Sequence, residues 1–344
     1  YKLPVIVSTH PHTRARMETF GVLNDNPQVR FLQPFGFFDF IQLERRAASR
    51  RGAELPSVEV PDSLLGREMI IMSRYARAQD GLGGAGANMA PNLVVKWERR
   101  DDRVLLRATS HQNIADEQTS IHIAVENSNF APVLQSLAIQ ARGRASSVVD
   151  ATDLYLTDIP AFTLPRNQRQ RFGVRSLDRN RSWIEWGRSF PTNVEIRVVH
   201  SYAADEPPSN ARGGTVSYEV NHSMIALPAE PMMARLNDER VGYISTGVTD
   251  YSRDYQGVRS QQFIRRYRLE PSDPAAFARG ELVEPKNPWV WYIDPATPAE
   301  WIPWFRDGLL EWNQAFEEAG FRNAIQVHVA PTEVVHDMRR GAQQ

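Results

Sequence analysis

The sequence has no cysteine among its 344 residues. This absence excludes disulfide bonds, zinc sites built from thiolates and a cysteine nucleophile. Lysine is almost absent as well, because Lys2, Lys96 and Lys286 are the only lysines among 40 basic residues. The net charge of −1 provides no field that would attract nucleic acid. No run approaches about 18 apolar residues, so we expect no membrane-spanning helix.

The length permits two domains, since a single hydrophobic core stops growing at about 250–300 residues. Residues 1–57 follow no clear pattern and are left unassigned. The first residues do not resemble a signal peptide, because their apolar run is too short and no small-residue cleavage site follows. We assign residues 58–284 to a β-rich domain and residues 285–344 to the start of a second domain, with the Pro-rich segment 282–288 at the boundary.

Strand-like segments recur at regular spacing within the first of these domains. Residues 93–99 and 103–109 flank a polar connection at 100–102, which predicts a hairpin. Further strands are predicted at 69–74, 119–125, 194–198, 216–220, 241–246 and 262–269. The sum is a mostly antiparallel β domain with short helices inserted.

The second domain is predicted to begin with a strand, a helix and another strand. Residues 289–293 read as a buried strand, and the alternation at 325–329 reads as its parallel partner. The intervening Thr297 and Glu300 fit a capping box, and Pro303 predicts a kink or a restart. One apolar stripe runs along the expected helix: Phe305, Leu309, Trp312 and Phe316. Gly320 stands where a left-handed C-terminal cap belongs. The predicted fold class is therefore α+β.

Gly81–Gly86 matches the G-x-G-x-x-G pattern of dinucleotide-binding loops. Pyrophosphate binding also needs a helix that starts after the last glycine. The residues that follow predict a β-rich segment, so we expect a loop here and no bound dinucleotide. No G-x-S-x-G occurs either, which removes the α/β-hydrolase nucleophile.

None of the eight histidines is followed by glutamate, so the chain has no H-E-x-x-H zinc site. The histidines are His10, His12, His111, His122, His200, His222, His328 and His336. His222 lies on a predicted strand on the same side as its apolar neighbours, where we expect a structural, hydrogen-bonded imidazole. The sequence thus assigns no catalytic, cofactor-binding or metal-ligating residue.

Several segments resemble the N-terminal portions of large bacterial zinc-dependent metalloproteases, which contain domains of unknown function. The segments that carry the resemblance are PDSLLGREM (61–69), VVDATDL (148–154), VNHSM (220–224), DERVGY (238–243), RLEPSDP (268–274), RGELVEP (279–285) and WYIDP (291–295) through AGFRNA (319–324). They follow one another in order over residues 58 to 326.

The resemblance implies a secreted or periplasmic peptidase that acts on proteins or peptides. It implies further that the segment after residue 285 begins a metzincin-like catalytic domain, and that H-E-x-x-H-x-x-G-x-x-H follows in the full-length protein. Zinc is expected there. No residue of that motif has a counterpart in this chain, so we expect no catalytic zinc bound to it.

Two other interpretations remain open. The chain could be a non-catalytic β domain that binds, chaperones or inhibits a protease partner, or a nucleotide-binding enzyme that uses Gly81–Gly86. A helix after Gly86 would favour the nucleotide-binding enzyme. An H-E-x-x-H encoded downstream would favour the metalloprotease. The sequence leaves the substrate and the oligomeric state open.

Overall fold

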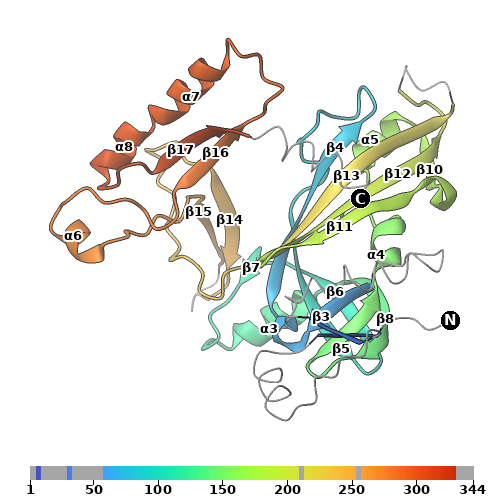
Figure 1. Ribbon diagram of the computed structural model, residues 1–344. Coiled ribbons are helices and arrows are strands. Elements are labelled where there is room, and N and C mark those ends of the chain that lie inside the picture. Colours follow the sequence, from blue (N-terminus) through green and yellow to red (C-terminus); the bar gives the residue numbers. More distant parts are fainter. Residues whose placement is uncertain (1–4, 9–28, 33–56, 209–212, 253–256, 331–344) are drawn as a thin grey trace. The chain divides into compact units, whose positions relative to one another are not determined.

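The computed structural model describes residues 5–8, 29–32, 57–208, 213–252 and 257–330 (Figure 1). The chain divides into two compact units. Unit 1 comprises residues 1–110 and 130–228, and unit 2 comprises residues 111–129 and 229–344. The boundary predicted at residue 285 lies inside unit 2, between two of its sheets, and remains a prediction about the family's domain organisation. In the described part of the chain, no helix is both long and apolar enough to cross a membrane.

Unit 1 is built on a ten-stranded, antiparallel sheet. The strand order is β10-β12-β13-β4-β5-β6-β8-β9-β3, and β11 also pairs with β12. The strands are β3 (Ser57–Pro61), β4 (Glu68–Ala78), β5 (Leu93–Arg100), β6 (Arg103–Thr109), β8 (Val133–Arg142), β9 (Ser146–Asp150), β10 (Val174–Leu177), β11 (Trp183–Ser189), β12 (Asn193–Ala204) and β13 (Thr215–Ala226). A separate parallel pair consists of β1 (Val5–Ser8) and β2 (Val29–Leu32). The predicted antiparallel β-rich domain is confirmed.

The large sheet curls into a half-barrel (Figure 1). Register shifts interrupt the ladders between β13 and β4 at Glu219/Val220 and between β6 and β8 at Leu106/Arg107. Such irregularities bend a strand and increase its local twist, so they let a long sheet curve. The predicted hairpin is confirmed as β5–β6, and its turn places Asp101 at φ 48°.

The inward-facing residues of the half-barrel form one hydrophobic core. Alternate residues of β12 and β13, such as Val198 and Val220, are completely buried, as period-two alternation predicts. The same core includes Leu154 and Tyr155 of α4 (Thr152–Leu156), together with Phe162 of the following loop. The remaining short helices of unit 1 are η2 (Asp62–Leu64), α5 (Arg166–Arg171) and η3 (Arg179–Arg181).

Unit 2 contains a small three-stranded sheet with the order β15-β14-β7. Its strands are β7 (Asn113–Ile114), β14 (Ser245–Asp250) and β15 (Arg259–Ile264), and the unit also contains α6 (Pro274–Ala278). The strands predicted at 241–246 and 262–269 therefore overlap β14 and β15 only at their ends. Asp238 forms a turn with Val241 through backbone atoms, which delays the start of β14.

The strand predicted at 119–125 is wrong, because this segment forms the helix α3 (Ile121–Ser128). The amides of Thr119 and His122 donate to the carbonyls of Asp116 and Thr119, so the chain is already turning before the helix starts. The alternation of Ile121, Ile123 and Val125 suggested a strand, but these local hydrogen bonds prevail because no neighbouring strand pairs with the segment in the described residues.

The predicted strand–helix–strand unit is present. β16 (Trp289–Ile293) pairs in parallel with β17 (Ile325–Val329), and α7 (Ile302–Leu310) and α8 (Asn313–Glu318) lie between them in the sequence. The helix begins at Ile302, later than the capping box predicted, because the segment before it folds as turns, with Asp294 accepting from the amide of Ala296. Gly320 has φ 90°, as predicted for its cap. Membership of this unit in a metzincin-like domain remains a prediction.

Candidate functional site

Several buried polar side chains contact one another on the inner face of the half-barrel, and we call them the inner network. His200 on β12 contacts the Tyr218 hydroxyl on β13, with 3.1 Å between Nδ1 and Oη. Its Nε2 lies 2.7 Å from the carbonyl oxygen of Tyr155 on α4. Tyr218 and Tyr202 stack with an interplanar angle of 16°. The network therefore joins two central strands to the helix beside them.

His222 forms the second part of this network. Its Nδ1 lies 2.8 Å from the Ser73 hydroxyl on the neighbouring strand β4. Its ring faces Tyr155 and Phe162 at centroid distances of 5.6 and 5.8 Å. Nε2 has no hydrogen-bond partner among the described residues. The prediction that His222 is a buried, hydrogen-bonded residue on the apolar side of its strand is confirmed.

An ion pair between Arg169 and Asp158 adjoins the network. The Arg169 guanidinium makes a bidentate contact with the Asp158 carboxylate, and Nη1 lies 2.7 Å from Oδ2. Asp158 also accepts hydrogen bonds from Thr163 and Tyr202. Burial disfavours the charged carboxylate, but the hydrogen bonds from Arg169 and Thr163 outweigh it and lower the pKa of Asp158.

Burial controls the protonation of the inner groups. It lowers the pKa of His222 to about 3 and also lowers the pKa of His200. It raises the pKa of Tyr202 to about 12. All three groups are therefore uncharged near neutral pH, because a charged form would have to give up water without adequate compensation.

The Ser73–His222 contact has the distance expected of a nucleophile and its base. Two features argue against such a role. Both side chains are sealed from solvent, since Ser73 is 3% and His222 is 2% exposed. No carboxylate or carbonyl orients the other imidazole nitrogen, because Nε2 lacks a partner among the described residues. The arrangement is a structural network, and a substrate cannot reach it in this conformation.

Gly81–Gly86 forms a loop, and no helix begins in the residues that follow it before β5. Gly81 and Gly86 have φ values of 84° and 83°, which only glycine adopts readily. The Gly86 amide donates to the Tyr75 carbonyl at 2.7 Å, and the loop then runs back along β4. The expected absence of a phosphate-binding helix is therefore confirmed for this segment, and the nucleotide-binding interpretation loses its main support.

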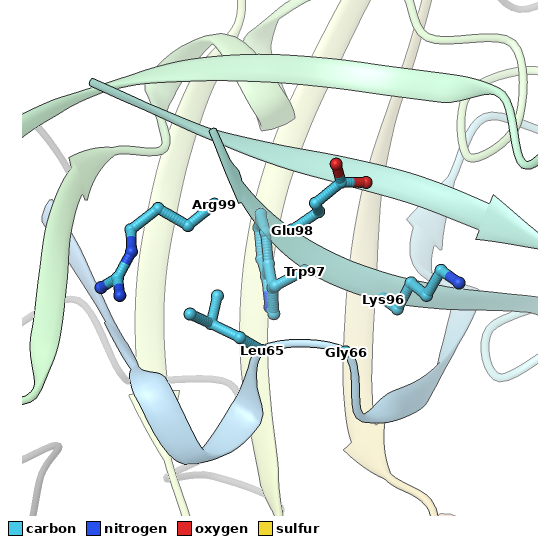
Figure 2. Close-up of a pocket in the computed structure, with 6 residues that line it drawn as sticks. All are labelled: Leu65, Gly66, Lys96, Trp97, Glu98 and Arg99. Carbon is cyan, nitrogen blue, oxygen red and sulfur yellow. The ribbon is translucent and has the colours of Figure 1, made fainter. Parts of the chain in front are cut away.

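A shallow depression of about 420 Å³ lies beside β5. It is lined by Leu65, Gly66, Lys96, Trp97, Glu98 and Arg99 (Figure 2). Its charged groups are largely engaged already, since Arg99 pairs with Asp62 and Glu98 pairs with Arg100. Lys96 and Arg99 extend to opposite sides of Trp97 (Figure 2). The depression therefore offers no convergent set of polar groups for a ligand.

The histidines that the structure describes do not come together in a metal site. In the part of the chain that the structure describes, no three His, Asp or Glu side chains are placed to hold an ion. His122 contacts the Ala115 carbonyl, and His328 packs beside Tyr292. His10, His12 and His336 lie outside the described residues. The described side chains thus do not fit a zinc ion, so no catalytic step is assigned to them.

Sequence reasoning had missed the partners of the inner network. Ser73 and Tyr155 are far from His222 in the sequence, and Asp158 and Arg169 belong to a segment without a clear pattern. The alternation of β13 predicted the side of the strand on which His222 lies. No pattern in the neighbouring sequence identifies the residues that contact His222.

Comparison with known protein families gives a match over about half of the chain. A family described as Domain of unknown function (DUF5117) matches residues 86–272. The match includes β12, β13 and the inner network except for Ser73, and it extends into unit 2. No curated protein and no solved structure matches the chain.

Proposed function

From the premise that the chain belongs to the DUF5117 family, we propose that it is the N-terminal portion of a secreted zinc-dependent metalloprotease. In the full-length protein, a zinc-activated water would hydrolyse a peptide bond of a protein or peptide substrate. The sequence segments described above, which resemble such proteases over residues 58 to 326, support this proposal. The zinc ligands and the general base would come from residues that this chain does not contain.

The observation that carries the proposal is the β16–α7–α8–β17 unit. A parallel pair joined by helices is the repeating unit of larger α/β sheets, and a two-stranded sheet is marginal in water. Unit 2 buries little apolar surface of its own. Among its described residues, the buried members of its core cluster are Ala276, Val283, Phe321 and Ala324. These features are expected of a structure that is completed by further strands and helices.

The exposed apolar side chains support the same interpretation. Among the described residues, all but four of the exposed large hydrophobic side chains belong to unit 2. Trp289 and Trp291 of β16 are among them, as is Tyr292. Surfaces of this kind usually mark sites where another structure packs. In the proposal, the remainder of the catalytic domain covers these side chains of β16.

The proposal is tested on the product of the complete coding region that contains this chain. We expect one tightly bound zinc per chain and casein hydrolysis that a chelator abolishes. Residues 1–344 alone should show neither, because they contain no H-E-x-x-H. A complete product that contains no zinc and cleaves no protein would contradict the proposal.

The second candidate is a non-catalytic β domain that binds, chaperones or inhibits a protease partner. The sealed inner face of unit 1 favours it, because the described residues provide packing and no accessible reaction site. Zinc and proteolysis separate the two candidates. A complete product that lacks both but binds and inhibits a protease would select this one.

A further inference from the structure

The helices α7 and α8 present two apolar stripes and not the single one predicted from the sequence. Leu309 and Phe316 are partly buried on the side of the β16–β17 pair, whereas Phe305 and Trp312 belong to a second, exposed stripe beside it. Glu311 and Trp312, which join the two helices, both have right-handed helical backbone angles, so the helical winding continues through the joint. The second stripe consists of Trp301, Phe305, Gly308, Trp312 and Ala315, all of which are exposed. Their spacing alternates between four and three residues, which is the a/d pattern of a helix that packs along another helix.

The first stripe and its neighbour Asn313 hold the helices against β17. Ile302, Leu309 and Phe316 are partly buried, and Asn313 donates to and accepts from the backbone of Ile325 at 3.0 and 2.9 Å. These contacts fix the rotation of the helices relative to β17. The second stripe cannot turn inward without breaking them, so its exposure is a consequence of how the helices are held.

Along the second stripe, large side chains are separated by small ones. Trp301, Phe305 and Trp312 are 54%, 53% and 63% exposed. Between them lies Gly308, where a Cβ atom would meet nothing within 4 Å. Ala315 provides a second gap one heptad later. Large side chains separated by small ones form knobs and holes, and the small positions let a second helix approach closely.

Acidic side chains border the stripe on its free side. Glu311 and Glu318 occupy two of the g positions of the same heptad frame, and the exposed Trp304 occupies the g position before them. Within the described residues, neither carboxylate has an ion pair or a hydrogen bond. The neighbouring Asp307 differs, because it is paired with Arg306. Charges at g positions select the partner helix through pairs of opposite sign.

We propose that the Trp301–Phe305–Gly308–Trp312–Ala315 stripe binds an amphipathic α-helix of another polypeptide that carries basic residues beside its apolar stripe. Lysine or arginine on the partner would face Glu311 and Glu318, and its apolar side chains would enter the gaps at Gly308 and Ala315. This binding site goes beyond the proposed peptidase function and requires no zinc.

A second copy of the chain fits this stripe poorly. An antiparallel copy would bring its own Glu311 and Glu318 towards the same carboxylates, and like charges at this position are unfavourable. In a parallel copy the glutamates would face the positions of Leu309 and Phe316, which are apolar and already partly buried in their own chain. The charge pattern therefore favours a basic partner.

The test uses the full chain and two synthetic helices with leucine at a and d. One has lysine at e and g, and the other has glutamate there. Fluorescence anisotropy of labelled peptide should show saturable binding of the lysine helix, weakened by salt, and at least about tenfold weaker binding of the glutamate helix. Glu311→Lys combined with Glu318→Lys should reverse this preference.

Gly308→Gln should abolish binding of the lysine helix, because the side chain fills the gap. Helix formation should not suffer, since glutamine favours helices more than glycine does. Gly84→Gln is the matched control, because a Cβ there also meets nothing within 4 Å and the residue lies in unit 1; it should leave binding unchanged.

Three results would overturn the proposal. The first is equal affinity for the two helices, and the second is a charge reversal that leaves the preference as it was. The third is self-association of the chain that Gly308→Gln eliminates, which would assign the stripe to a second copy.

Discussion

At the scale of single residues, the inner network shows how a buried histidine can be structural. His222 lies among aromatic rings, and among the described residues its imidazole has one hydrogen-bond partner, Ser73. One polar contact inside a low-dielectric core contributes more than the same contact at the surface. The uncharged imidazole therefore fills space and ties β13 to β4, and a charged imidazole would be costly.

Replacing His222 tests this role. His222→Ala should lower the free energy of unfolding by about 1–3 kcal/mol, because the Ser73 hydroxyl is left buried without a partner. Urea denaturation followed by circular dichroism measures the loss. Ser73→Ala should restore part of it in the double variant, since it removes the orphaned hydroxyl. Unchanged stability of the single variant would show that the contact has no structural weight.

The pH dependence of stability follows from the same burial. The pKa of His222 falls from 6.5 to about 3 in the folded state, so the unfolded state binds more protons below pH 6.5. Stability should be complete above that pH and should fall as the pH drops towards 3, by up to about 1.4 kcal/mol per pH unit for one histidine. His200, whose pKa is also lowered, adds to the slope.

Urea midpoints between pH 4.5 and 8 measure this slope. The carboxylates with lowered pKa values, such as Asp158, act at more acidic pH, because their contribution is lost only below their ordinary pKa of 3.8. His222→Ala should make the decline shallower by about one proton. A wild-type midpoint that stays constant down to pH 4.5 would contradict the assignment of two buried neutral imidazoles.

At the scale of elements, the sequence predicted the structure best where no local hydrogen-bonding pattern competed with the periodicity of the apolar residues. The alternation in 194–198 and 216–220 predicted β12 and β13, and the polar residues 100–102 predicted the β5–β6 hairpin. It failed for α3, whose β-branched residues alternate although the local hydrogen bonds are helical. It also failed at Thr297, because the turn around Asp294 competes with the capping box.

The cap at Gly320 can be tested against a second glycine of the same segment. Gly320→Ala should destabilise the chain by about 1–3 kcal/mol, because φ is 90° and the new Cβ would lie 2.6 Å from the Phe277 ring. Gly308→Ala should instead stabilise it by about 0.5–1 kcal/mol, since that position is helical and open. Thermal unfolding distinguishes the two, and equal effects would mean that the left-handed cap has no influence.

At the scale of the whole molecule, the two units differ in how completely each forms a core. Unit 1 buries a continuous cluster around residues such as Val198, Val220 and Leu106. Unit 2 has a small cluster and many exposed aromatic side chains. The length permitted two domains, but no sequence pattern indicated that residues 111–129 belong to unit 2. That contribution depends on β7 pairing with β14, a contact between residues far apart in the sequence.

Hydrogen exchange should show this difference. Amides of residues 289–329 should exchange faster than those of β12 and β13 at 194–199 and 215–220, because local opening costs less where few apolar contacts are broken. Mass spectrometry of peptides from the intact chain measures both regions in one sample. The lysine helix described above should slow exchange in residues 300–318 and leave β12 unchanged. Equal protection of the two regions in the unliganded chain would show that unit 2 is already complete.

The two hydrogen bonds between Asn313 and Ile325 also decide in which direction the small parallel sheet can grow. The Trp289 amide donates to the Ala324 carbonyl, so the backbone N–H and C=O groups of the odd-numbered residues of β16 bond to β17. The backbone groups of the odd-numbered residues of β17 therefore point away from β16, towards the free edge of the sheet. Asn313 occupies the first of those outward positions and competes with any strand that approaches β17. The opposite edge, where Val290 and Tyr292 point outward, has no such amide among the described residues. An incoming strand would therefore join at β16, and β17 would remain the last strand of the sheet.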